Sequence, residues 1–67
     1  MITLKINGEE RQFSEALTVV ALIEHLGYTG KRIAVERNGD IVPKSQHALT
    51  PLVSGDRLEI VVAVGGG

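Results

Sequence analysis

Hydrophobic and polar residues alternate at the start of the chain, where residues 2–6 read Ile-Thr-Leu-Lys-Ile. A period of two places successive side chains on opposite faces and is typical of a half-buried β-strand. The next two residues, Asn7-Gly8, both tolerate the positive φ of a type I′ turn. The pattern therefore predicts a β-hairpin over residues 2–13. A two-residue loop would pair Ile2 with Phe13, Lys5 with Glu10 and Leu4 with Arg11.

The pattern then changes to a helical period. An apolar stripe at i, i+3, i+4 and i+7 is formed by Val19, Leu22, Ile23 and Leu26. Thr18 is placed to cap the first turn, because its hydroxyl can accept a backbone N–H, and Leu17 stands at the position of a hydrophobic staple with Leu22. Gly27 suits the left-handed residue that ends a helix, and Tyr28 can fold back onto Ile23. We predict one amphipathic helix here.

Two more strands are predicted on either side of a second tight turn. Residues 33–37 are apolar and β-branched at their start, and Asn38-Gly39 follows them. A short strand over residues 40–42 should stop at Pro43, which cannot donate a ladder hydrogen bond.

The next segment, residues 44–51, reads as a loop with one short helical turn. We expect three apolar side chains in and after it to reach the core, namely Leu49, Leu52 and Val53. Ser54-Gly55-Asp56 forms a turn, and residues 57–62 alternate again as the last strand.

These elements predict an α+β fold in which one main helix packs on one mixed sheet. The first and last strands should lie side by side and parallel, joined by a right-handed crossover. This is the β-grasp arrangement of ubiquitin. We assign residues 1–64 to this domain and residues 65–67 to a flexible C-terminal glycine tail.

Composition narrows the functional classes. The chain has 67 residues, a net charge of −1 and no cysteine, so thiolate metal sites and disulfides are excluded. Acidic and basic residues are interspersed and only Phe13 and Tyr28 are aromatic, which argues against nucleic-acid binding. No apolar run is long enough for a membrane span, and no signal peptide is evident, so we predict a cytoplasmic protein.

The two histidines give no sign of a metal site. His25 and His47 are far apart in the sequence, and we expect both at the surface, with His25 near the C-terminus of the helix. Without a nucleophile–base set, the chain is predicted not to be an enzyme.

The last residues, Gly65, Gly66 and Gly67, follow a good strand directly. Glycine loses more backbone entropy on ordering than any other residue, so this run does not serve to stabilise the fold. It suits either a frayed terminus or a slender arm that enters a narrow site on another protein. We predict that the chain is mobile from Val64 or Gly65 onward.

Residues 38–46, residues 54–61 and the terminal Gly-Gly, in this order and spacing, resemble the sulfur-carrier family of thiamin thiazole synthesis (ThiS). The likeness covers essentially the whole chain, and Gly65 is an additional glycine. The small subunit of molybdopterin synthase is similar, but it tends to have Phe and Pro-Pro before its Gly-Gly, where this chain has residues 60–64 of Ile-Val-Val-Ala-Val. Other sulfur carriers, a ubiquitin-like modifier and a plain adaptor domain remain alternatives.

The resemblance implies chemistry at Gly67. An E1-like adenylyltransferase (ThiF-type) is expected to adenylate its carboxylate with ATP. A sulfur donor such as a cysteine desulfurase would then give a thiocarboxylate, which delivers sulfur to a thiazole synthase (ThiG-type). The chain itself is expected to bind no cofactor.

The final strand also suggests where such partners dock. Alternation points Leu58, Ile60 and Val62 toward the core. Val61 and Ala63 then face outward, with Val64 after them, and we predict that these three residues belong to a docking patch.

Overall fold

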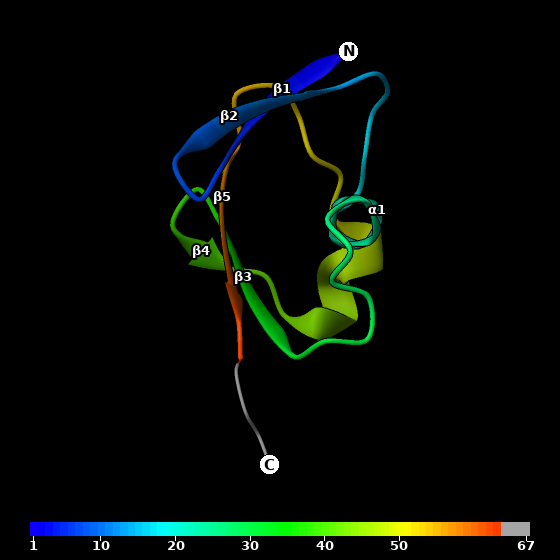
Figure 1. Cartoon of the computed structure of the whole chain (residues 1–67), viewed down its shortest axis with the longest axis vertical. Helices are drawn as coiled ribbons and strands as arrows, with labels where there is room; N and C mark the ends of the chain where they lie inside the picture. The colour runs from blue at the N-terminus through cyan, green and yellow to red at the C-terminus, as the bar shows by residue number, and fades with distance from the viewer. Residues whose placement is uncertain (64–67) are drawn as a thin grey trace.

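The structure, a computed structural model, describes residues 1–63. Five strands and two helical segments follow one another along the chain: β1 (Ile2–Ile6), β2 (Glu9–Phe13), α1 (Val19–His25), β3 (Ile33–Arg37), β4 (Asp40–Ile41), the 3₁₀-helix η1 (Lys44–Leu49) and β5 (Arg57–Val62). The strands form one sheet in the order β2-β1-β5-β3-β4, and α1 and η1 lie together on one side of it (Figure 1). This confirms the predicted mixed sheet packed on one main helix.

The β1–β2 hairpin has the predicted register. Ile2 pairs with Phe13, Lys5 with Glu10 and Leu4 with Arg11, around a turn in which Asn7 and Gly8 have φ of 49° and 85°. Arg11 stands opposite a fully buried leucine, yet its side chain is exposed. Its guanidinium carbon lies 6.0 Å from the centre of the Phe13 ring, so the charged head reaches solvent over an aromatic face.

Both ends of α1 carry the predicted caps. The Thr18 hydroxyl accepts a hydrogen bond from the Ala21 N–H at 3.2 Å. At the other end Gly27 has a φ of 78°, and its N–H and that of Tyr28 donate to the carbonyls of Glu24 and Ile23. These two bonds form a Schellman motif, which satisfies carbonyl groups that the helix leaves unpaired.

The core lies between α1 and the inner face of the sheet. Its buried members are Leu4, Ile6, Leu17, Val19, Leu22, Ile23, Val35, Leu52, Leu58 and Ile60. The predicted parallel pairing of β1 with β5 is confirmed, and it brings Ile6 opposite Leu58. Leu58 and Ile60 face the core, as the alternation of β5 predicts.

Three expectations for the segment after β4 are wrong. Leu49 and Val53 are 70% and 56% exposed, whereas Leu52 alone of the three apolar residues is buried. His47, expected at the surface, is only 7% exposed, and its Nε2–H donates to the Val42 carbonyl at 3.1 Å.

For His47 and Leu49 the reason lies in the 3₁₀ geometry of η1, in which residues two apart lie on different faces of the helix. Val53 lies after η1, in the loop before β5. His47 lies on the buried face of η1, and Leu49 lies on an exposed face. His25, by contrast, is exposed as predicted.

The predicted fourth strand is also shorter than expected. β4 ends at Ile41, and Val42 lies outside it although its N–H still donates to the Val35 carbonyl at 2.8 Å. Pro43 follows and has no N–H to continue the ladder.

Candidate functional site

The candidate site is the end of β5, which runs down the length of the molecule (Figure 1). Along its last half β5 pairs with β3, from Val35 opposite Ile60 to Ile33 opposite Val62. One residue further, the Ala63 N–H donates to the Arg32 carbonyl at 2.8 Å. The chain is therefore hydrogen-bonded to the segment before β3 up to the last described residue.

The glycine tail itself lies outside the described residues. This holds for Gly65, Gly66, the predicted reactive residue Gly67, and Val64, the third residue of the predicted docking patch. The predicted mobility of this segment and the domain boundary at residue 64 likewise lie outside the described residues.

The outer face of the sheet near this end carries exposed apolar side chains. Val61 is 63% exposed, and Ala63 is also exposed, which agrees with the predicted outward orientation of both. Ala34 stands opposite Val61 on β3, and Ile41 on the edge strand β4 is 63% exposed. We call Ala34, Ile41, Val61 and Ala63 the outer apolar patch.

Two carboxylates stand beside this patch. Glu36 of β3 lies directly opposite Glu59 of β5, and both are exposed. Like charges at directly opposed positions destabilise a sheet. The pair therefore costs the isolated protein some stability and leaves negative charge on the outer face. Ala34 and Glu36 were missed as site residues because only the pairing of β3 with β5 brings them beside β5, and Ile41 was missed because only the pairing of β4 with β3 places it opposite Glu36.

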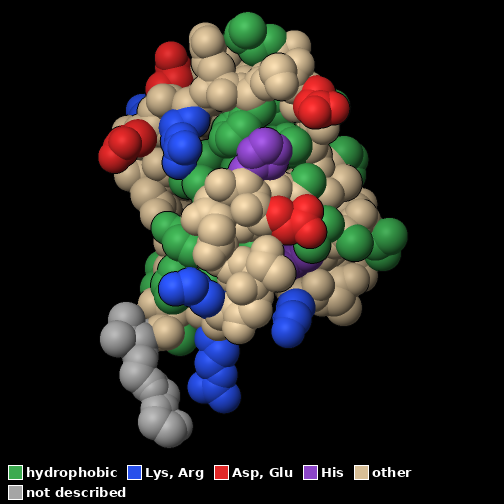
Figure 2. All heavy atoms as spheres, turned by 45° about the vertical axis from the view of Figure 1, so that its right-hand side comes forward, with side chains coloured by type: hydrophobic (Ala, Val, Ile, Leu, Met, Phe, Trp, Pro, Cys, Tyr) green, Lys and Arg blue, Asp and Glu red, His purple; other side chains and the backbone are tan. Residues whose placement is uncertain are grey.

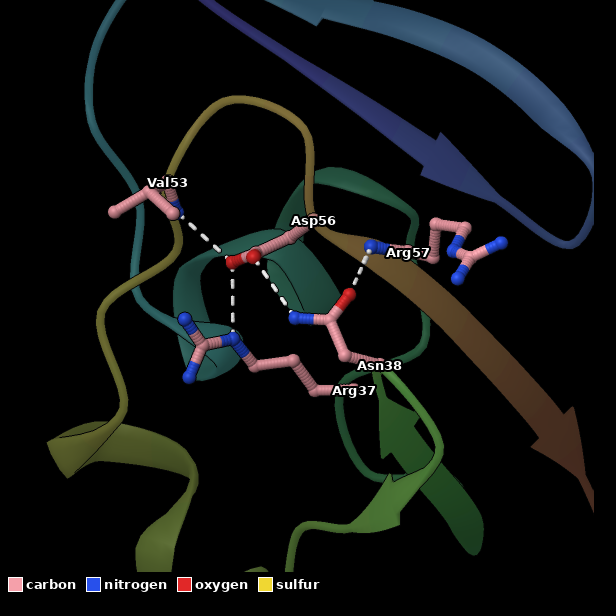
Figure 3. Close-up of polar contacts among 5 residues, drawn as sticks. All are labelled: Arg37, Asn38, Val53, Asp56 and Arg57. Atoms are coloured by element: carbon pink, nitrogen blue, oxygen red, sulfur yellow. Dashed lines mark hydrogen bonds and ion pairs between the residues drawn. The ribbon is translucent and has the colours of Figure 1, made fainter.

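The start of β5 is held by a buried carboxylate (Figure 3). Asp56 is 5% exposed, and its Oδ2 accepts hydrogen bonds from Arg37 Nε and the Val53 N–H, both at 2.9 Å. Its Oδ1 accepts from Asn38 Nδ2 at 3.0 Å, while Asn38 Oδ1 accepts from the Arg57 N–H at 2.9 Å. This network joins the turn before β4 to the turn before β5.

The electrostatic state of Asp56 follows from these contacts. Burial by itself raises the pKa of Asp56, but the hydrogen bonds from Val53, Asn38 and Arg37, with the charge of Arg37, outweigh it and lower the pKa from its ordinary value of 3.8. Asp56 is therefore an anion near neutral pH, and its hydrogen bonds hold the start of β5 to the end of β3. From the sequence it was identified only as a turn residue.

Within residues 1–63, no three histidine or carboxylate side chains come close enough together to hold a metal ion. In the same part of the chain, neither α1 nor η1 is long and apolar enough to cross a membrane.

Comparison with known proteins places the chain among thiamin-related proteins. Residues 4–67 match the profile of the ThiS family. The chain is 55% identical over 64 residues to a thiazole synthase of Paramagnetospirillum magneticum, covering 96% of this chain but 20% of that protein. It is also 36% identical to the uncharacterized protein ycf40 of Porphyra purpurea, covering 98% of this chain and 93% of that one. The chain thus spans about a fifth of the length of the thiazole synthase that it matches.

The fold has a solved counterpart. The crystal structure of the thiamine biosynthesis protein ThiS from Geobacter metallireducens superposes with a TM-score of 0.83 at 28% identity. The match covers 98% of this chain and 100% of the other. It confirms the predicted β-grasp fold.

Proposed function

The chain belongs to the ThiS family, and we propose that it is a sulfur carrier of thiamin biosynthesis that holds sulfur at the carboxyl group of Gly67. The observation that carries this proposal is the family match, which runs to residue 67 and so includes the glycine tail. The fold of the ThiS protein from Geobacter metallireducens supports it.

The proposed chemistry begins with an unreactive group. A terminal carboxyl group has a pKa of about 3.3–3.7, so near neutral pH it is an anion and a poor electrophile. An E1-like adenylyltransferase joins this carboxylate to the AMP part of ATP and releases pyrophosphate. The acyl-adenylate that results has AMP as a good leaving group.

Sulfur then replaces AMP at the acyl carbon. A persulfide on a donor such as a cysteine desulfurase attacks this carbon with its outer sulfur, and AMP leaves. A thiol then reduces the S–S bond of the acyl disulfide, which releases the terminal thiocarboxylate and leaves the donor cysteine joined to that thiol as a disulfide. This anionic sulfur is the nucleophile that a thiazole synthase receives. The chain binds no cofactor in this scheme, and ATP is used by the activating partner.

We assign the chain no catalytic residue, so its role in this scheme is to place Gly67 in the active site of the partner. A fully extended chain covers at most about 3.3–3.6 Å per residue, so the four residues after Ala63 reach roughly 14 Å. The partner must therefore bring its reactive atoms within that distance of Ala63. We therefore propose that the partner contacts the folded part of the chain, residues 1–63, because the reach is short.

We assign that contact to the outer apolar patch together with Val64. Val61 and Ala63 lie next to the tail, and the neighbouring Glu36 and Glu59 offer charge to cationic side chains of a partner. Because three glycines provide almost no side-chain contact, most of the binding free energy has to come from the sheet face. The relatives named thiazole synthase, which contain a segment similar to this chain, support that enzyme as one partner.

The proposal is tested by reconstitution. The chain is incubated with its adenylating partner, ATP and a sulfur donor, and its intact mass is measured. We expect replacement of one oxygen by sulfur in the full chain and no change in a variant that lacks Gly67. If the truncated variant gains sulfur equally well, Gly67 is not the site.

A further inference from the structure

A second surface lies on the opposite side of the sheet from the outer apolar patch. It is a depression of about 390 Å³ between α1, the link before β3 and the start of η1. Its apolar lining comes from Val20, Ile23, Tyr28 and Ile33. We call this depression the helix-side groove.

The rim of the helix-side groove is basic. Lys31, Arg32 and Lys44 line it, and all three side chains are exposed. Among the described residues, Glu24 is the one carboxylate that lines it. Figure 2 shows Lys and Arg side chains gathered at the lower end of this face of the molecule.

This positive charge is not neutralised locally. Among residues 1–63 the ion pair is between Arg37 and Asp56, and none of the three cations at the groove lies within 4.0 Å of a carboxylate oxygen of that part of the chain. The whole chain has a net charge of −1, so the groove is a local excess of the opposite sign. Such an excess attracts an acidic surface and accelerates its encounter.

The groove is next to the end of β5. Arg32, on its rim, accepts the hydrogen bond from Ala63 through its backbone carbonyl at 2.8 Å. A protein that takes the residues after Ala63 therefore comes close to this rim. One partner protein could therefore contact both the groove and the outer apolar patch when it takes the end of the chain, although the two surfaces lie on different faces of the sheet.

We infer that the helix-side groove binds an acidic segment of the adenylating enzyme that also carries apolar side chains. This inference rests on the proposed function. The basic rim complements carboxylates, and the apolar lining gives the neighbouring side chains a surface to bury. A free phosphate or nucleotide would use the rim but leave Val20, Ile23 and Ile33 without a partner.

The test is the adenylation rate of charge-reversal variants as a function of salt. The variant Lys31→Glu/Lys44→Glu changes two exposed side chains of the rim. We expect its KM for the carrier to rise about tenfold or more at low ionic strength and this difference to shrink at high salt, with kcat unchanged. Glu24→Gln, which removes the opposing charge, should lower KM.

A matched control is Arg11→Glu, an exposed cation of strand β2 that does not line the groove. It should leave KM close to that of the parent. Circular dichroism confirms that each variant is folded.

The outcomes separate the two proposals. If the parent chain is not adenylated at all, the proposed function fails. If the parent is adenylated and the double variant has the same KM at low salt, the groove does not face the adenylating enzyme and the inference is overturned. Saturable binding of ATP to the chain alone, lost in the double variant, would also overturn it, because the groove would then be a nucleotide site.

Discussion

The side-chain amide of Asn7 forms two hydrogen bonds with the backbone of Ile60, 53 positions away in the sequence. Its Oδ1 accepts from the Ile60 N–H at 2.7 Å, and its Nδ2 donates to the Ile60 carbonyl at 3.0 Å. The ladder between β1 and β5 ends at the pair of Ile6 and Leu58, and this amide adds hydrogen bonds to β5 two residues further along that strand. A turn residue thus supports β5 on the side where β1 has ended.

Replacing Asn7 tests this support. Asn7→Gly keeps a residue that tolerates the positive φ but removes both hydrogen bonds, and it should lower the free energy of unfolding by about 1–3 kcal/mol. Asn7→Ala should cost more, because alanine also strains the backbone at φ of 49°. Urea denaturation measures both. An Asn7→Gly variant as stable as the parent would show that the amide contributes nothing.

The buried carboxylate predicts how stability depends on pH. Because the pKa of Asp56 is lower in the folded chain than its ordinary value of 3.8, its contribution is complete above that value. It is lost as the pH falls from 3.8 through the lower pKa of the folded state. The free energy of unfolding, measured from neutral pH down to strong acid, should therefore decline in that range.

Asp56→Asn is the matched control for this prediction. It should be less stable near neutral pH, since it loses the charged interaction with Arg37, and its stability should decline less at acid pH. A variant with the same acid profile as the parent would assign the decline to other carboxylates.

Alanine substitutions of one buried and one exposed leucine should have very different effects on stability. Leu22 of α1 is fully buried in the core, so Leu22→Ala should cost roughly 2–5 kcal/mol by leaving a cavity. Leu49 is 70% exposed, so Leu49→Ala should change stability by less than about 0.5 kcal/mol. Thermal or urea unfolding of the pair checks this. Equal losses would contradict the placement of η1.

The outer apolar patch predicts a mutation that harms binding and not folding. Val61→Asp adds a charge at a 63% exposed position and should weaken the complexes with both the adenylating enzyme and thiazole synthase. Val53→Asp, at a 56% exposed position in the loop before β5, should bind both partners like the parent. Titration calorimetry with each partner measures the affinities. A folded Val61→Asp variant with unchanged affinity for both would refute the assignment.

Much of the fold could be predicted because its signals are local. The Asn7-Gly8 turn, the Thr18 cap and the Gly27 ending each depend on residues within one turn of the chain, and all three are present as expected. The outward orientation of Val61 followed from simple alternation along β5.

The features that escaped prediction depend on contacts between distant residues. Asp56 gains its role from Arg37 and Asn38, which only the β3–β5 pairing brings close. His47 is buried and Leu49 is exposed, the reverse of what we expected, because η1 is a 3₁₀-helix. The sequence of this segment did not indicate that helix type. The basic rim likewise combines a link before β3 with the start of η1.

The most direct test of the central claim is the intact mass of the chain isolated from its own cells under conditions of active thiamin synthesis. The account predicts a free chain in which one oxygen has been replaced by sulfur, with fragmentation placing the sulfur at Gly67. A chain found only with an unmodified carboxylate, or joined through its end to lysine side chains of other proteins, would contradict it.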